Sequence, residues 1–219
     1  MKATAGPRSR LTTPHAAAIA GVLFALLFGV ALICIRTALP EGAERGAQFF
    51  DDSSIRLRVA GVLMPFAGIA FLWFIGVLRD GFGALEDKFF ASVFLGSGLV
   101  FLSMIFASTA VGAGLMAVSH SGLVSGVHDE VMEFGRALLI ALASTFALRM
   151  AAVFMISSAT IWLKTGLMPK WLVVLTYVVA VGNLIAGDVS LWIVLTFPVW
   201  VLVVSVLLLV RAGVIMGDD

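Results

Sequence analysis

The chain of 219 residues is 61% hydrophobic and only 12% charged, with a net charge of +1. A soluble domain has about 25% charged residues, so this composition excludes an ordinary soluble globular protein and indicates a membrane protein. The small net charge provides no basic surface for nucleic acid, and no nucleic-acid-binding motif is present, so we expect no nucleic-acid partner. The lone cysteine, Cys34, cannot form a disulfide within the chain.

Six apolar stretches reach or approach the length of about 20 residues that a helix needs to cross the hydrocarbon core of a bilayer. The sequence therefore predicts an all-α fold, a polytopic membrane bundle of six transmembrane helices. The predicted spans are 16–35, 59–78, 91–118, 137–163, 171–186 and 189–210. They form one domain, 16–210, between a cytoplasmic N-terminal tail (1–15) and a cytoplasmic C-terminal tail (211–219). The third and fourth spans exceed the bilayer thickness, so they should tilt or extend into the interface.

The first span follows a basic N-terminal segment and is longer than the apolar region of a cleaved signal peptide, so an uncleaved signal anchor is predicted. Small residues recur at every fourth position of this span, which allows a neighbouring helix backbone to approach closely. Packing inside one copy and self-association of two copies both remain open for this stripe. Its members are Ala17, Gly21, Ala25 and Gly29.

The distribution of Lys and Arg between the loops predicts the orientation, because cytoplasmic loops carry more of them. With the N-terminus inside, the inner segments hold Lys2, Arg8, Arg10, Arg79, Lys88, Lys164, Lys170 and Arg211. The outer loops hold the smaller set Arg36, Arg45, Arg56, Arg58 and Arg136. Both termini are therefore predicted in the cytoplasm. Between the fifth and sixth spans, Gly187 and Asp188 should form a tight turn at the outer surface.

Arg149 is the one charged residue inside the fourth span, where a guanidinium costs at least ~2.5–3.5 kcal/mol at the helix centre. Counting helical rise from Lys164 and Lys170 places Arg149, Asn183 and Asp188 in the outer third of the hydrocarbon core. Thr145 falls on the same helix face as Arg149. These four residues are candidates for a ligand-binding site or for a structural charge cluster in which Asp188 pairs with Arg149. A third interpretation is that Arg149 extends to the outer headgroups.

The third predicted loop contains His120, His128 and Glu130, residue types that bind metal ions. Their spacing matches neither H-E-x-x-H nor the Glu-x-x-His pair of di-iron bundles, so they are weak metal candidates and no metal is predicted. The sequence also lacks a P-loop, a G-x-G-x-x-G and a G-x-S-x-G motif. We expect no catalytic residues and no cofactor.

Two segments carry a resemblance, "FLWFIGVLRDGFGALEDKFFASVFLGSGLVFLSMIF" (71–106) and "IWLKTGLMPKWLVVLTYVVAVGNLI" (161–185). The first resembles small multi-pass membrane proteins of actinobacteria, and the second is similar to an inner turn of such six-helix families of unknown function. The resemblance implies a bacterial plasma membrane and no functional residues. The sequence favours a non-enzymatic structural or accessory membrane protein. The alternative is a small-solute transporter or a ligand sensor that uses Arg149.

Overall fold

The computed structural model describes residues 13–38, 49–82, 88–119, 125–186 and 191–216, and these segments are helical apart from the turn at 166–169. The prediction of an all-α bundle is confirmed for this part of the chain. In order the elements are α1 (Thr13–Ala38), α2 (Phe49–Phe82), α3 (Lys88–Ser119), α4 (Ser125–Ile140), the π-helical segment η2 (Ala141–Ala147), α5 (Leu148–Thr165), α6 (Lys170–Ala186), the 3-10 segment η3 (Leu191–Leu195) and α7 (Thr196–Met216).

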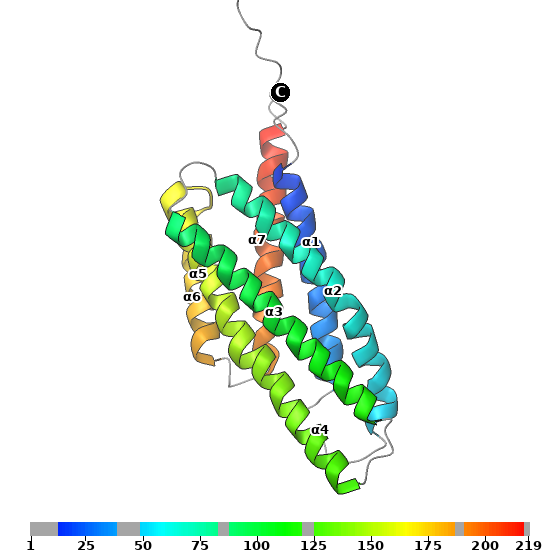
Figure 1. Cartoon of the computed structure of the whole chain (residues 1–219). Coiled ribbons are helices and arrows are strands. Elements are labelled where there is room, and N and C mark those ends of the chain that lie inside the picture. Colours follow the sequence, from blue (N-terminus) through cyan, green and yellow to red (C-terminus); the bar gives the residue numbers. More distant parts are fainter. Residues whose placement is uncertain (1–12, 39–48, 83–87, 120–124, 187–190, 217–219) are drawn as a thin grey trace, which may run out of the picture.

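Because α4, η2 and α5 form one continuous helix and η3 leads into α7, the described residues form six helical segments that alternate in direction along the bundle (Figure 1). The first turn of α1 and the last turn of α7 lie at the same end of the bundle (Figure 1). That end also carries the turn between α5 and α6. An even number of alternating passes requires this arrangement.

Five stretches are long and apolar enough to cross a membrane, while α6 supplies a shorter apolar helix, Lys170–Ile185. The five are Ala18–Ala38, Ile55–Arg79, Lys88–Val118, Glu130–Thr165 and Trp192–Val210. The longest has 36 residues, which corresponds to about 54 Å of helix against a hydrocarbon core of about 30 Å. The structure therefore supports a membrane protein built from apolar helices.

Two helices begin well before the boundaries that hydropathy predicts. α2 starts at Phe49 rather than at 59, and α4 starts at Ser125 rather than at 137. Hydropathy identifies only the apolar part of a helix, whereas the helix itself extends as far as its backbone hydrogen bonds continue. Part of each extension meets a neighbouring helix: Arg56 of α2 bonds the Thr37 carbonyl of α1, and Gly135 of α4 lies against Leu115 of α3.

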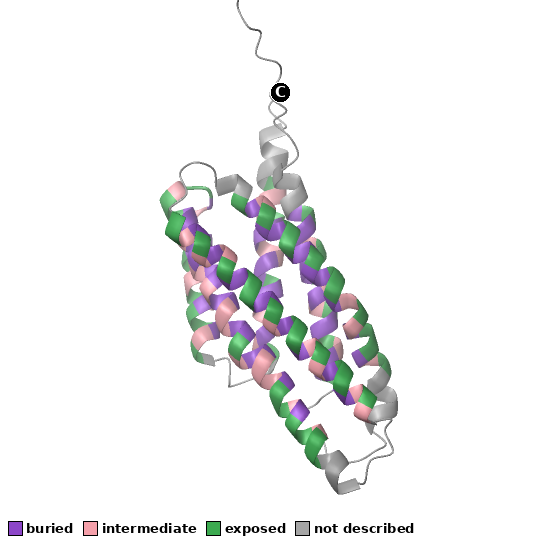
Figure 2. Ribbon diagram, in the orientation of Figure 1, coloured by how far each residue is buried: buried purple, intermediate pink, exposed green. Residues whose placement is uncertain are grey.

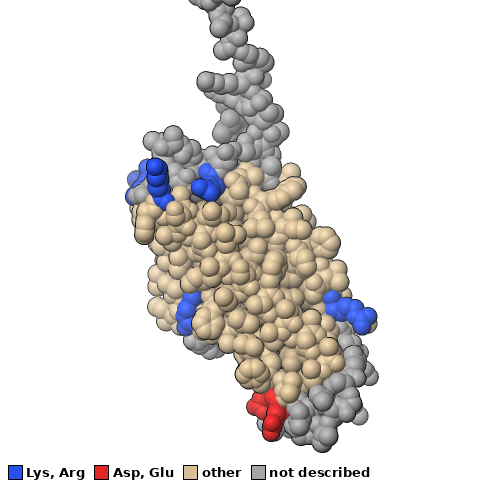
Figure 3. All heavy atoms as spheres, in the orientation of Figure 1, with Lys and Arg blue, Asp and Glu red and all other residues tan. Residues whose placement is uncertain are grey.

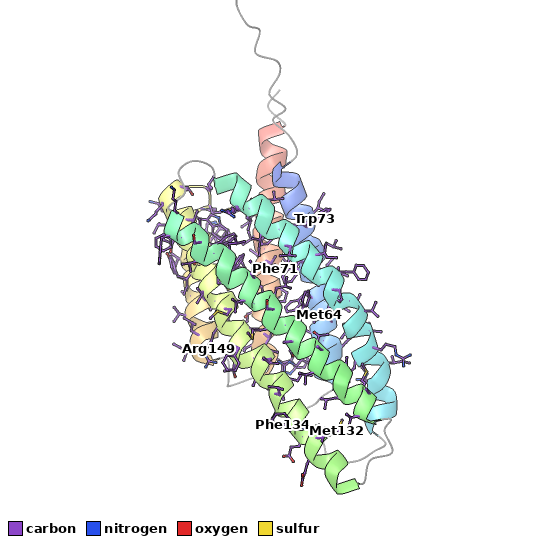
Figure 4. All side chains as sticks on the ribbon, viewed as in Figure 1. Met64, Phe71, Trp73, Met132, Phe134 and Arg149 are labelled. Carbon is purple, nitrogen blue, oxygen red and sulfur yellow. The ribbon has the colours of Figure 1, made fainter. Side chains whose placement is uncertain are left out.

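Phenylalanine rings from five helices meet at the centre of the bundle, around Phe71 of α2. The centroid of the Phe71 ring lies 4.6 Å from Phe24 of α1, 5.4 Å from Phe101 of α3, 5.5 Å from Phe154 of α5 and 5.8 Å from Phe197 of α7. All five side chains are at most 1% exposed. Phe71 lies inside the bundle, while Trp73 points outward and is 70% exposed (Figure 4). This cluster joins every pass except α6.

The helices that pack most closely on one another are α1 with α2 and α7, and α3 with α5. α6 lies against α5 and touches α7 mainly through side chains. In α1, a Cβ atom at Gly21 would collide with the Ser205 hydroxyl and with the Phe74 ring, whereas a Cβ at Gly29 would meet nothing within 4 Å. Gly21 and the buried Ala25 therefore serve packing inside the bundle.

The outer surface between the two ends of the bundle is mostly apolar. Exposed and buried residues alternate along each helix, so every described helix has one face toward the core and one face away from it (Figure 2). In the space-filling view, charged side chains are confined to a few places, and the body between them carries neither sign (Figure 3). A large exposed apolar surface is typical of membrane or protein–protein contact.

Candidate functional site

A π-helical segment, η2, interrupts the long helix from α4 to α5. Its seven residues, Ala141–Ala147, are mostly small, and Ala143, Ser144 and Ala147 are buried. A π turn includes one residue more than an α turn, so it displaces the backbone hydrogen-bond ladder by one position and changes which groups have helical partners. Such segments occur frequently at functional sites.

Arg36 approaches η2 from the last turn of α1. Its side chain is 8% exposed, and its Nη2 donates a hydrogen bond of 3.0 Å to the hydroxyl oxygen of Ser144. Sequence reasoning placed Arg36 in an outer loop, because the apolar stretch ends at residue 35. That placement is wrong: α1 continues to Ala38 and turns Arg36 toward the core.

Arg149 lies two residues beyond the end of η2, in the first turn of α5, and is partly buried. Its Nη1 donates a hydrogen bond of 2.8 Å to the carbonyl oxygen of Thr145, so the backbone of Thr145 accepts one of its hydrogen bonds. Figure 4 labels Arg149 on the half of the bundle away from the turn between α5 and α6, which agrees with the depth expected from Lys164. Asp188, its predicted partner, lies outside the described residues, so the charge pair stays a prediction.

Two further side-chain hydrogen bonds hold the surroundings of η2. Ser108 of α3 is 4% exposed and donates a hydrogen bond of 3.0 Å to the carbonyl oxygen of Leu139, just before the π turn. Arg56 of α2 donates to the carbonyl oxygen of Thr37 at 3.0 Å. A cation at a helix C-terminus stabilises the helix dipole, so Arg56 helps to hold the end of α1 that presents Arg36.

Asn183, a third member of the predicted site, contacts α5 and the start of α7. It is 1% exposed; its Oδ1 accepts a hydrogen bond of 2.8 Å from the Thr196 hydroxyl, and its Nδ2 lies 3.9 Å from the sulfur of Met155. These contacts join α6 to the start of α7 and to α5. Asn183 therefore links three helices, and its place in a common site with Arg149 stays a prediction.

The weak metal candidates are only partly within the described residues. Glu130 is exposed on α4, His128 lies in the first turn of α4 with its side chain outside the description, and His120 falls in an undescribed segment. Within the described ranges, no three His, Cys, Asp or Glu residues are grouped closely enough to hold a metal ion.

Arg36 and Ser144 are the residues of this site that sequence reasoning missed. One local signal was available: Arg36 follows the apolar run without a break, so helical continuation would place it one turn beyond Leu32 and beside that residue's buried face. Its partner is 108 positions away, and no sequence pattern indicates that contact. The arrangement can present guanidinium groups, whose planar donors suit a carboxylate or a phosphate, next to a π turn.

Comparisons of this chain with protein-family models, with curated proteins and with solved structures give no match.

Proposed function

We propose that this protein is a six-pass integral protein of a bacterial plasma membrane, with both termini in the cytoplasm and a structural or accessory, non-enzymatic role. The observation that carries the proposal is the exposed apolar surface of the bundle. Large apolar side chains such as Trp73, Val178 and Ile185 are 64–75% exposed, which water would penalise and lipid would accept. This surface supports the membrane embedding. The short helix α6 adds one pass to the five longer apolar stretches.

The charges at the two ends support the proposed orientation. Figure 3 shows Lys and Arg side chains at the end near the α7 C-terminus and on both flanks lower down, and acidic side chains at the opposite end. By their elements, Lys164 and Lys170 flank the turn between α5 and α6, while Glu130 and Glu133 lie on α4. The proposed orientation depends on the positive-inside rule applied to the whole sequence, in which eight Lys and Arg residues belong to the inner segments and five to the outer loops.

The packing of the interior supports a structural role. The centre of the bundle is filled by phenylalanine rings rather than by polar groups that could bind a substrate. The buried polar groups near it are engaged with one another: Trp200 donates to Thr176 at 2.9 Å, and Thr160 and Tyr177 are 2.8 Å apart. The resemblance to small actinobacterial membrane proteins supports the bacterial plasma membrane.

The orientation is tested by cysteine labelling on intact cells in a Cys34→Ser background, which contains no other cysteine. Cysteines at Ser53 and at Ser125 are expected to react with an impermeant maleimide, and a cysteine at Thr165 is expected to react only after the membrane is permeabilised. Labelling of Thr165 on intact cells, with protection of Ser125, would reverse the orientation. Extraction of the chain by alkaline carbonate would contradict membrane embedding altogether.

A second candidate function is favoured by one observation, the two arginines that bind the π-helical segment. The Ser144 hydroxyl and the Thr145 carbonyl, on adjacent residues, accept hydrogen bonds from Arg36 and Arg149. A small anionic solute that bound either guanidinium would compete with the hydrogen bond between that arginine and η2. This is the arrangement that a ligand sensor or a small-solute transporter would use, and ligand-dependent stabilisation lost in Arg149→Lys would distinguish it from the structural role.

A further inference from the structure

The turn between α5 and α6 carries two lysines beside exposed aromatic and aliphatic side chains. Lys164 lies in the last turn of α5, and Lys170 is the first residue of α6; both are exposed. Gly166, with φ of 67°, ends α5 in the left-handed conformation, and its N–H bonds the Trp162 carbonyl at 2.9 Å. The five residues between the lysines include no acidic side chain.

Lys164 is held in place by a neighbouring helix. Its Nζ lies 4.5 Å from the centroid of the Phe90 ring of α3, a distance typical of a cation–π contact. The contact brings the start of α3, with the exposed Phe89, next to the turn. We call this set of residues the basic collar: Phe89, Lys164, Leu167, Lys170 and Trp171.

An apolar stripe starts at the collar and runs the length of α6. Trp171, Val174 and Val178 follow one another at helical spacing and are 54%, 61% and 64% exposed. Cations at the head of an exposed apolar stripe match a molecule with an anionic head and a long apolar tail. A free phosphate would use the cations and leave the stripe without a role.

We propose that the basic collar binds the headgroup of an anionic phospholipid in the cytoplasmic leaflet, with an acyl chain along the α6 stripe. The two ammonium groups contact the phosphate as point charges, and Trp171 lies at the level of the headgroups, where indole rings are enriched. The proposal rests on the membrane embedding proposed above, because the collar meets lipid only if the bundle spans the bilayer.

The test is native mass spectrometry of the purified full chain in detergent, titrated with phosphatidylglycerol or with phosphatidylcholine that has identical acyl chains. We expect the wild type to bind phosphatidylglycerol more tightly. Each of Lys164→Gln and Lys170→Gln is expected to weaken that binding about five-fold, the change that corresponds to about 1 kcal/mol per basic residue at an anionic surface. The double variant should lose the preference between the two lipids.

Three controls accompany the titration. Lys164→Arg with Lys170→Arg should keep the preference because the charges remain, and Arg58→Gln, which removes an exposed cation on α2, should keep it as well. Inorganic phosphate at millimolar concentration should not displace the lipid. Displacement by phosphate would overturn the assignment to a lipid.

Equal binding of the two lipids by the wild type, or an undiminished preference in the double Gln variant, would overturn the collar proposal. Such a failure is distinguishable from a failure of the proposed function. Resistance of the chain to extraction by alkaline carbonate is measured on the membranes from which the chain is purified. It shows whether the chain is embedded in the bilayer, whichever lipid headgroup the collar binds. A chain that resists carbonate and shows no lipid preference contradicts only the collar.

Discussion

At the scale of single residues, the hydrogen bond between Arg36 and Ser144 allows a test of how a buried cation is stabilised. Hydrogen bonds to charged groups stabilise a fold by about 1.5–3 kcal/mol. We expect Ser144→Ala to lower the free energy of unfolding by about that amount, because the buried guanidinium keeps its charge and loses an acceptor. The measurement is unfolding in mixed detergent micelles.

The matched control is Ser103→Ala on α3, an exposed hydroxyl that bonds only to the Leu99 carbonyl of its own helix. Exposed substitutions of this kind stay within about ±0.5 kcal/mol. If both variants lose the same free energy of unfolding, the hydrogen bond between Arg36 and Ser144 does not contribute to stability.

Arg149 supports a prediction of a different kind, because the structure gives it one partner in its own helix. If Asp188 is a second partner, Arg149→Leu and Asp188→Leu should each lower the thermal unfolding temperature, and the double variant should lower it less than either single change, because both charges leave together. Breaking a buried pair costs about 3–5 kcal/mol, and less near the interface. Arg149→Lys should keep only part of the stability that Arg149→Leu loses, since an ammonium lacks the planar fork of donors of a guanidinium.

Additive losses in this double-mutant cycle would show that the two residues do not interact. The hydrogen bond from Arg149 to the Thr145 carbonyl, at 2.8 Å, would remain in that case.

At the scale of elements, α1 is positioned by a glycine at its closest approach to other helices. We expect Gly21→Ala to destabilise the protein, because the new methyl group would meet the Ser205 hydroxyl and the Phe74 ring on two neighbouring helices. Overpacking of this kind costs about 1–3 kcal/mol.

Gly29→Ala on the same helix is the control. Nothing lies within 4 Å of its Cβ position, and alanine favours a helix over glycine by up to about 1 kcal/mol, so this variant should be neutral or stabilising. The measurement for both is thermal unfolding in detergent. The opposite order of stability would mean that the α1 stripe serves contact between copies instead of packing in the monomer.

At the scale of the whole molecule, the position of α6 determines whether the chain makes its sixth pass. The Thr196 hydroxyl and the Asn183 Oδ1 are 2.8 Å apart. In the Cys34→Ser background, we expect Asn183→Cys with Thr196→Cys to react with a short bifunctional thiol reagent within one chain. Mass spectrometry of the monomer detects the product.

Each single-cysteine variant controls for crosslinks between copies. Absence of the intramolecular product, with both cysteines accessible to a small maleimide, would contradict the placement of α6 beside α7.

The sequence by itself determined the helical class and most of the spans. Lipid accepts only apolar helices, so the apolar stretches around 91–118 and 189–210 could be recognised without any knowledge of packing. The turn after α5 was also readable, since glycine and proline between Lys164 and Lys170 end one helix and precede the next. Both features depend only on residues that are close together in the sequence.

Only the tertiary structure decided which polar residues meet. Arg36 was expected in a loop and is buried against Ser144, and the hydrogen bond between Asn183 and Thr196 was not expected from the sequence. The meeting of five phenylalanine rings around Phe71 was equally invisible. The physical reason is that helical periodicity fixes only the face on which a side chain lies. The rotation and the neighbours of each helix depend on contacts between residues far apart in the chain.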